Sequence, residues 1–207
     1  MTLSQNSLLV ILLHGVGSSG SDLAPLGENW HSRLPDITFA SPNAPEPCSF
    51  SAGYQWFSVV GVTEENRTAR ITAARPAFDA LITRIIEEHG FTGRLDKVVF
   101  AGFSQGTIMS LDAVADGRWP IAGVIGFSGR LATEKPLDPT LQTRILLLHG
   151  TADNVIPSWE TEKAATELTA AGMTVETVIE PGLGHTISMS GAERAGAFLA
   201  TLVTKDG

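Results

Sequence analysis

Ser104 stands at the centre of Gly102-Phe103-Ser104-Gln105-Gly106, a pattern that can present a serine as a nucleophile. The stretch follows the apolar run Val98–Ala101 and precedes residues 107–111, which can continue as a helix. Glycine two positions before and two positions after the serine lets the backbone turn sharply with no Cβ in the way. The pattern therefore predicts a strand, a tight turn and a helix with the serine hydroxyl at the tip. The alternative is a glycine-rich turn whose serine only caps the helix.

A serine nucleophile needs a base to take its proton and an acid to orient that base. Asp153 follows the apolar run Arg144–Leu148, and His185 follows the run Thr174–Ile179 across a glycine-rich loop. Each could instead be an ordinary loop residue, with Asp153 bonding nearby backbone and His185 facing solvent. The order Ser104, Asp153, His185, each just past a separate strand, is that of the α/β-hydrolase triad. We therefore expect these three residues to be catalytic.

The remaining histidines fit the role of base less well. His31 and His89 fall at or near the ends of helical segments, away from the expected sheet edge. His14 and His149 each precede a glycine after an apolar strand, so we expect them to brace their loops, although His14 could also line the site. Asp112 follows Ser104 on the same predicted helix, too close along the chain to reach a histidine at a neighbouring strand end.

Acyl transfer also needs backbone N–H groups that stabilise a developing oxyanion. Gln105, directly after the serine, can supply one of them. The loop after the first buried strand, residues 14–20, should supply the other, and we assign it to Val16.

The same loop offers a competing interpretation, because Gly15, Gly17 and Gly20 match the G-x-G-x-x-G dinucleotide fingerprint. That fingerprint also needs an acidic residue at the end of the second strand to bind a ribose. Asp36 has the right spacing but precedes the candidate strand, and prolines at 25 and 35 interrupt the intervening helical pattern. A nucleotide-binding oxidoreductase therefore remains the weaker alternative.

Apolar runs alternate with helical patterns along the chain, which predicts one α/β domain over 1–207 with a mostly parallel central sheet and helices on both faces. The expected strands are Leu8–Leu13, Ile37–Ala40, Asp96–Ala101, Ile121–Phe127, Arg144–Leu148 and Thr174–Ile179. The expected helices are one with an apolar face from Phe78 to Ile86, one from Ser104 to about Asp116, one capped by Ser158 that ends near Gly172, and one opened by a Ser190–Glu193 capping box. Pro76 either starts the first of these helices or kinks a longer one.

Composition excludes several classes of protein. The 207 residues carry a net charge of −8 with no basic run, so we expect no nucleic-acid partner. The single cysteine, Cys48, excludes an intrachain disulfide and a cysteine-based metal cluster. Met1–Ser7 lacks Lys and Arg, and the next apolar run has only six residues, so we expect no signal peptide, no membrane insertion and a cytoplasmic location.

Taken together, the motifs resemble the phospholipase/carboxylesterase family, which includes acyl-protein thioesterases and small bacterial carboxylesterases. The resemblance covers nearly the whole chain, from Leu8 to about Leu202. The segments that carry it are residues 12–17, 41–45, 56–57, 102–106, 149–157 and 184–187. It implies an α/β-hydrolase fold, esterase activity without a metal, the triad Ser104, Asp153 and His185, and oxyanion donors at Val16 and Gln105.

Two positions depart from the family pattern. Thr107 stands where a second glycine usually follows Gly106, and Ser58 stands where an aspartate usually follows the aromatic pair. Neither departure touches the expected triad, but both affect the finer assignment of substrate. We expect Thr107 either to stiffen the start of the helix or to crowd a neighbour.

The expected reaction is hydrolysis of a small-molecule ester or thioester through an acyl-enzyme, with no metal or organic cofactor. An apolar pocket favours short or medium acyl chains, and the long segment 42–62 could serve as a lid. The expected pocket residues are Trp56, Phe57, Phe103, Phe127, Leu131, Ile156 and Ile187. A non-catalytic binding protein on the same fold remains an alternative. The oligomeric state is left open, a homodimer included.

Overall fold

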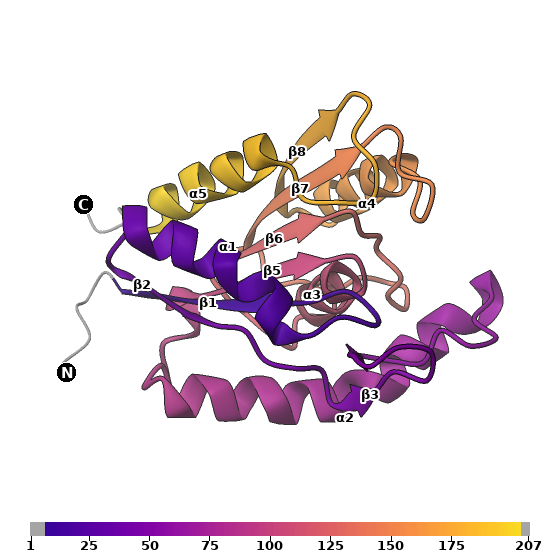
Figure 1. The fold of residues 1–207 in the computed structure, drawn as a ribbon, viewed down its shortest axis with the longest axis horizontal. Helices are drawn as coiled ribbons and strands as arrows, with labels where there is room; N and C mark the ends of the chain where they lie inside the picture. The colour runs from indigo at the N-terminus through magenta and orange to yellow at the C-terminus, as the bar shows by residue number, and fades with distance from the viewer. Residues whose placement is uncertain (1–6, 204–207) are drawn as a thin grey trace.

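The structure is a computed structural model that describes residues 7–203. Six strands in this range form one fully parallel sheet in the order β2-β1-β5-β6-β7-β8 (Figure 1). The sheet strands are β1 (Leu8–Leu13), β2 (Ile37–Ala40), β5 (Val98–Phe103), β6 (Gly123–Phe127), β7 (Arg144–Gly150) and β8 (Thr174–Glu180). The short strands β3 (Glu46–Pro47) and β4 (Tyr54–Gln55) pair separately and antiparallel. The expectation about a leader at Met1–Ser7 lies, Ser7 apart, outside the described residues.

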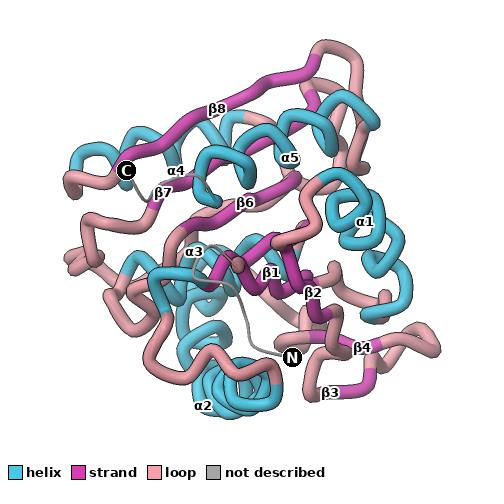
Figure 2. The backbone as a smooth tube through the Cα atoms, turned by 90° about the vertical axis from the view of Figure 1, so that its left-hand side faces the viewer, coloured by secondary structure: helices cyan, strands magenta, loops and turns pink. Residues whose placement is uncertain are grey.

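In the described residues, five α-helices cover the two faces of the sheet (Figure 2). They are α1 (Gly20–Arg33), α2 (Glu64–Glu88), α3 (Gln105–Ala115), α4 (Trp159–Ala170) and α5 (Met189–Val203). Helices α1 and α5 pack on one face, and α2, α3 and α4 pack on the other. The sequence of β1 is a continuous apolar run because the strand is buried on both faces of the sheet. Leu9, Ile11 and Leu13 pack in the core on the α2, α3 and α4 face, and the alternate residues pack in the core on the α1 and α5 face. The expected α/β architecture is confirmed.

Some local predictions were wrong. Helix α1 forms although Pro25 lies inside it. Of the two alternatives left open for Pro76, the structure has the longer helix, because Pro76 lies within α2. Ser158 stands at the N-cap of α4 without a side-chain capping bond. The Ser190–Glu193 capping box is absent, because α5 begins one residue before Ser190.

The cap of α5 is Ser188, whose Oγ accepts the backbone N–H of Gly191 at 2.8 Å. Ser188 and Ser190 both donate to the carboxylate of Glu180, at the end of β8. The start of α5 is therefore set by Glu180 of the preceding strand. The sequence pattern around Ser190 alone does not reveal this contact.

His14 braces the loop after β1, as expected from its sequence context. Its Nδ1 lies 2.7 Å from the carbonyl oxygen of Gly15, which can only accept, so Nδ1 carries the proton. Its Nε2 accepts the backbone N–H of Ala44 at 2.9 Å. The indole of Trp56 donates to the His14 carbonyl at 2.8 Å. This buried histidine thus joins the loop after β1 to two points in the segment that follows β2.

Thr107 fills space that two glycines leave open. A Cβ at Gly126 would lie 2.6 Å from the Thr107 methyl group, and a Cβ at Gly129 would overlap the same side chain. The hydroxyl of Thr107 bonds the carbonyl oxygens of Gly102 and Phe127, at 2.7 and 2.9 Å. The threonine therefore joins the start of α3 to the ends of β5 and β6.

We predict that Gly129→Ala lowers the unfolding free energy by about 1–3 kcal/mol, because the new methyl group presses on Thr107. In a Thr107→Gly background the same substitution should cost much less. Chemical denaturation of the wild type, both single variants and the double variant gives the coupling energy. A coupling energy of zero would contradict the contact.

We predict a pH dependence of stability from His14. Burial lowers the pKa of His14 below its ordinary 6.5, against smaller opposing effects of the Gly15 carbonyl and Asp22. Below pH 6.5 the unfolded chain therefore binds a proton that the folded chain does not, so stability falls as the pH is lowered, by at most about 1.4 kcal/mol per pH unit.

The measurement compares chemical denaturation of the wild type and of His14→Gln between pH 7 and pH 5. The variant should be less stable at pH 7 but should lose stability more slowly on acidification. The other histidines contribute to both curves alike, so parallel curves would show that His14 is not the source of the difference.

Candidate active site

The turn that carries Ser104 joins β5 directly to α3. Ser104 has φ 53° and ψ −113°, a backbone conformation that L-residues rarely adopt. A Cβ at Gly102 would overlap the start of α3, and a Cβ at Gly106 would overlap the carbonyl of Leu13. The Ser104 N–H donates to the Phe127 carbonyl at 2.9 Å. The two flanking glycines are thus needed for close approach, and neighbouring strands hold the strained turn in place.

His185 lies between the side chains of Ser104 and Asp153. Its Nε2 is 3.0 Å from Ser104 Oγ, and its Nδ1 is 2.7 Å from Asp153 Oδ2. These residues are 81 and 32 positions away from His185 along the chain. All three follow the carboxyl ends of sheet strands, the edge of a parallel sheet at which sites are usually built. The arrangement can pass a proton from the hydroxyl to an imidazole whose orientation is fixed.

The carboxylate of Asp153 is fully buried and has partners on both oxygens. Its Oδ1 accepts the backbone N–H groups of Val155 and Ile156, at 2.8 and 2.9 Å, and its Oδ2 faces His185. Burial by itself raises the pKa of Asp153. The hydrogen bonds from His185 and from the two backbone groups outweigh burial, so the pKa lies below its ordinary value. The residue is therefore a fixed negative charge beside the imidazole.

The loops that carry Asp153 and His185 brace each other. The N–H of Ala152 donates to the Leu183 carbonyl at 2.9 Å, and the N–H of Thr151 donates to the Glu180 carbonyl at 3.0 Å. A Cβ at Gly150 would overlap the backbone of Leu183, so the loops approach at a position where only glycine fits. Asp153 and His185 are therefore held to one another by backbone as well as by side chains.

The expected oxyanion donors lie at the same edge of the sheet. Within residues 7–203, neither the N–H of Val16 nor that of Gln105 has a hydrogen-bond acceptor. The side chain of Gln105 accepts the Trp56 N–H at 2.8 Å and donates to the Phe57 carbonyl at 2.7 Å. Trp56 in turn bonds the His14 carbonyl, so one buried network ties Gln105 to the loop of Val16.

The expected pocket residues do not form one cluster. Trp56, Phe57, Leu131 and Ile156 belong to or pack against the core on the α2, α3 and α4 face of the sheet. Phe103, Phe127 and Ile187 belong to or pack against the core on the other face. The ring of Phe103 lies 4.9 Å from that of His185, measured between centroids. The role of these residues as a pocket stays a prediction.

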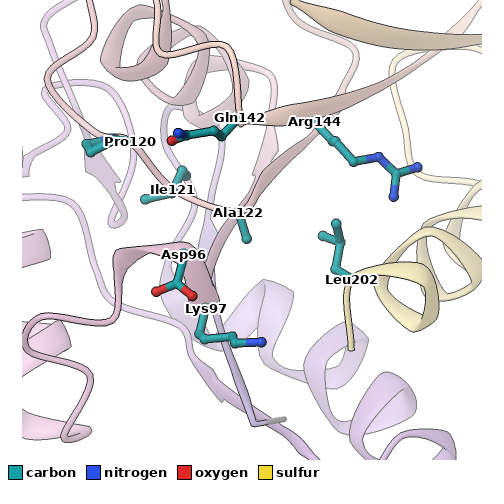
Figure 3. Close-up of a pocket in the computed structure, with 8 residues that line it drawn as sticks. All are labelled: Asp96, Lys97, Pro120, Ile121, Ala122, Gln142, Arg144 and Leu202. Carbon is teal, nitrogen blue, oxygen red and sulfur yellow. The ribbon is translucent and has the colours of Figure 1, made fainter. Parts of the chain in front are cut away.

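Two cavities lie at opposite edges of the sheet. One, of about 210 Å³, is lined at the amino ends of the strands by residues such as Lys97, Ile121 and Arg144 (Figure 3), far from the end of β5 that carries Ser104. Another, of about 470 Å³, lies between the start of α2, the segment after β6 and the start of α4, and Leu131 lines it. The second cavity opens at the edge where the site is built.

The dinucleotide fingerprint is not completed. Strands β1 and β2 are parallel, so Asp36 at the start of β2 lies at the opposite edge from the glycine loop after β1. Gly20 has another role, because a Cβ there would overlap the backbone of Ser41 and its N–H bonds the side chain of Asn43.

Neither a metal cluster nor a membrane-spanning helix is found in the described part of the chain. Within residues 7–203, no group of three or more His, Cys, Asp or Glu side chains could hold a metal ion. In the same range, no helix is long and apolar enough to cross a membrane.

Sequence reasoning missed two residues that support the site. His149, expected only to brace its loop, lies 3.1 Å from Asp153 Oδ2 through its Nε2. Glu180 anchors Ser188 and Ser190 just beyond the loop of His185. Their position at strand ends could have indicated them. His149 is the penultimate residue of β7, and Glu180 is the last residue of β8.

Comparison with known proteins identifies the family of this chain. The family model described as Phospholipase/Carboxylesterase matches residues 3–203. Esterase YpfH of Escherichia coli (strain K12) is 37% identical over 180 residues, which cover 86% of this chain and 76% of that protein. Acyl-protein thioesterase 1 of Gibberella zeae is 29% identical over 216 residues, with 95% and 91% covered.

A solved structure supports the assignment to this family of esterases. The crystal structure of esterase PE8 superimposes with a TM-score of 0.85 at 34% identity, with 95% of this chain and 93% of that chain covered. The chain belongs to the phospholipase/carboxylesterase family, and it is a hydrolase.

Proposed function

We propose that the protein hydrolyses carboxylic esters or thioesters of short to medium acyl chains, with Ser104 as nucleophile, His185 as general base and acid, and Asp153 as the group that orients His185. The observation that carries this proposal is the hydrogen-bonded chain from Ser104 Oγ through His185 to Asp153. Relatives named esterase and acyl-protein thioesterase support the cleavage of both oxygen esters and thioesters.

In the first half of the reaction, Ser104 Oγ attacks the carbonyl carbon while His185 Nε2 takes the hydroxyl proton. The tetrahedral oxyanion accepts hydrogen bonds from the N–H groups of Val16 and Gln105. The bond to the leaving group then breaks, and His185 gives its proton to the leaving alkoxide or thiolate. Asp153, a buried negative charge, stabilises the imidazolium that forms between these steps.

In the second half, a water molecule takes the place of the leaving group. His185 accepts one proton from the water as its oxygen attacks the acyl-serine, and the oxyanion forms again between the same two N–H groups. Collapse of the intermediate releases the carboxylic acid and returns the proton to Ser104 Oγ. The balance is one ester and one water consumed, one acid and one alcohol or thiol released.

We predict that Ser104→Ala lowers kcat by roughly 10⁴ to 10⁶-fold with a native fold, because it removes the nucleophile. A fluorophosphonate probe should add to the wild-type chain at Ser104, as read by peptide mass spectrometry. Ser110→Ala is the matched control, since Ser110 is a buried serine on α3 that bonds only the Gly106 carbonyl. Labelling of Ser104→Ala at the wild-type rate would refute the assignment.

We predict that kcat/KM rises with acyl length over short chains and falls for long ones. Each methylene that is buried adds up to about 0.8 kcal/mol of binding until the apolar space is filled. Matched series of p-nitrophenyl esters and acyl thioesters of increasing length give the optimum and the preferred acyl bond. A value that keeps rising to the longest chains would reject the short-to-medium assignment, while no turnover in either series would reject the enzyme activity itself.

A further inference from the structure

Val16 carries one of the two backbone N–H groups that the proposed reaction uses. The peptide unit from Gly15 to Val16 lies beside Ser104, because a Cβ at Gly15 would be 3.4 Å from Ser104 Cβ and 3.2 Å from the Phe103 ring. The bond between Gly15 and Val16 is trans. In a trans peptide the C=O and the N–H of one unit lie in one plane and point in opposite directions. A group that holds the Gly15 carbonyl therefore also fixes the direction of the Val16 N–H.

The side chain of His14 holds that carbonyl. Its Nδ1–H donates to the Gly15 oxygen at 2.7 Å, and its Nε2 accepts the N–H of Ala44 at 2.9 Å. The contact with Ala44 requires an Nε2 without a proton, which leaves the single proton of the neutral ring on Nδ1. The histidine is fully buried, so both contacts are shielded from water. The Ala44 N–H therefore selects the tautomer that can bond the Gly15 carbonyl.

The other contacts of this loop are weaker or lie on another peptide unit. The N–H of Ser18 also donates to the Gly15 oxygen, but at 3.3 Å. The indole N–H of Trp56 donates to the His14 carbonyl, which belongs to the preceding unit. Within residues 7–203, no side chain other than that of His14 bonds the Gly15 carbonyl. The imidazole thus makes the shorter of the two bonds that orient the unit of Val16.

The second expected oxyanion donor, the N–H of Gln105, is held in a different way. Its peptide unit contains the Ser104 carbonyl, which accepts the N–H of Ile108 at 3.1 Å in the first turn of α3. Helical geometry therefore directs the Gln105 N–H without help from a side chain. Val16 lies outside any helix, so its donor needs a separate partner for the carbonyl.

We propose that His14 is a positioning residue that aims the Val16 N–H at the oxyanion through its bond to the Gly15 carbonyl. This inference rests on the proposed function, in which Ser104 is the nucleophile and Val16 is an oxyanion donor. His14 takes no part in the proton transfers, so it acts only through the peptide unit between Gly15 and Val16. Because that donor matters most when the substrate oxygen becomes negatively charged, loss of the bond should weaken the transition state more than substrate binding.

Two amide variants separate the contact with Gly15 from the contact with Ala44. The amide nitrogen of asparagine reaches the position of Nδ1, and the amide oxygen of glutamine reaches the position of Nε2. His14→Asn can therefore keep the donor to Gly15 but loses the acceptor for Ala44, and His14→Gln does the reverse.

We expect kcat/KM to fall about tenfold to a hundredfold in His14→Gln, mainly through kcat. The fall should be smaller than the roughly 10²–10³-fold loss that follows removal of a whole oxyanion donor, because the longer bond from Ser18 remains. His14→Asn should keep most of the wild-type kcat/KM even though it is less stable. Both variants are measured at a temperature at which circular dichroism shows them folded.

A tetrahedral adduct supplies a readout that loss of packing alone would not move. A trifluoromethyl ketone with a short alkyl chain adds to Ser104 and places an oxyanion where the reaction would place it. Its inhibition constant should rise in His14→Gln by about the factor by which kcat/KM falls, and should change little in His14→Asn. The corresponding secondary alcohol cannot form the adduct, so it should bind the wild type and both variants alike.

His31 offers a matched control. Its Nδ1 also bonds a backbone carbonyl, that of Ile37, at 2.6 Å. Ile37 begins β2, so this contact lies at the opposite edge of the sheet from Ser104. His31→Gln and His31→Asn should therefore keep the wild-type kcat/KM and the wild-type inhibition constant for the ketone.

Three results would overturn the inference: a folded His14→Gln enzyme with the wild-type kcat/KM, a His14→Asn enzyme that is impaired as strongly as His14→Gln, or a fall in kcat/KM with no change in ketone inhibition. The first and third are read from His14→Gln alone, so they apply even if His14→Asn does not fold. Failure of the proposed function looks different, because the wild type would then neither turn over esters nor react with the fluorophosphonate.

Discussion

The whole site depends on one close approach between two backbones. The first turn of α3 lies against the end of β1, so near that position 106 cannot carry a Cβ beside the carbonyl of Leu13. Because β1 and β5 are adjacent in the sheet, this contact brings the N–H of Gln105 to the same edge as the loop of Val16. It also requires the strained backbone of Ser104, which costs of order 1–3 kcal/mol and is held by the surrounding strands. Ser104 is therefore placed by the sheet and does not depend on a flexible loop.

Much of this arrangement could be predicted from the sequence, because the central strands β1, β5, β6 and β7 are buried on both faces and read as apolar runs. The edge strands β2 and β8 are only partly buried, and β8 includes Glu176 and two threonines, but both were still located by their β-branched and apolar residues. Parallel strands end at one edge, so residues just past their carboxyl ends are brought together whatever their separation along the chain. That rule predicts a meeting of Ser104, Asp153 and His185, and the distances of 3.0 and 2.7 Å agree with it.

What could not be predicted was decided by partners far away in the sequence. Helix α5 starts where it does because Glu180 of β8 binds Ser188, although Ser190 has the better local pattern. Helix α1 contains Pro25, and its long-range contacts include the bond from Gly20 N–H to Asn43 and the burial of Trp30. Apolar side chains near the site could be listed, but the sequence does not say which face of the sheet each one covers.

The three histidines at this edge of the sheet show how one residue type takes different roles. The proton of His14 points at a carbonyl, and both its nitrogens are occupied in a fully buried position. His149 is equally enclosed, with its Nε2–H bonded to the Ile156 carbonyl and its Nδ1 bonded to the Thr161 hydroxyl. His185 is partly exposed, bonds the Asp153 carboxylate through its Nδ1 and turns its Nε2 towards Ser104. A carboxylate stabilises an added proton more strongly than a carbonyl does, so the ring that bonds Asp153 and has room at Nε2 is the one suited to proton transfer.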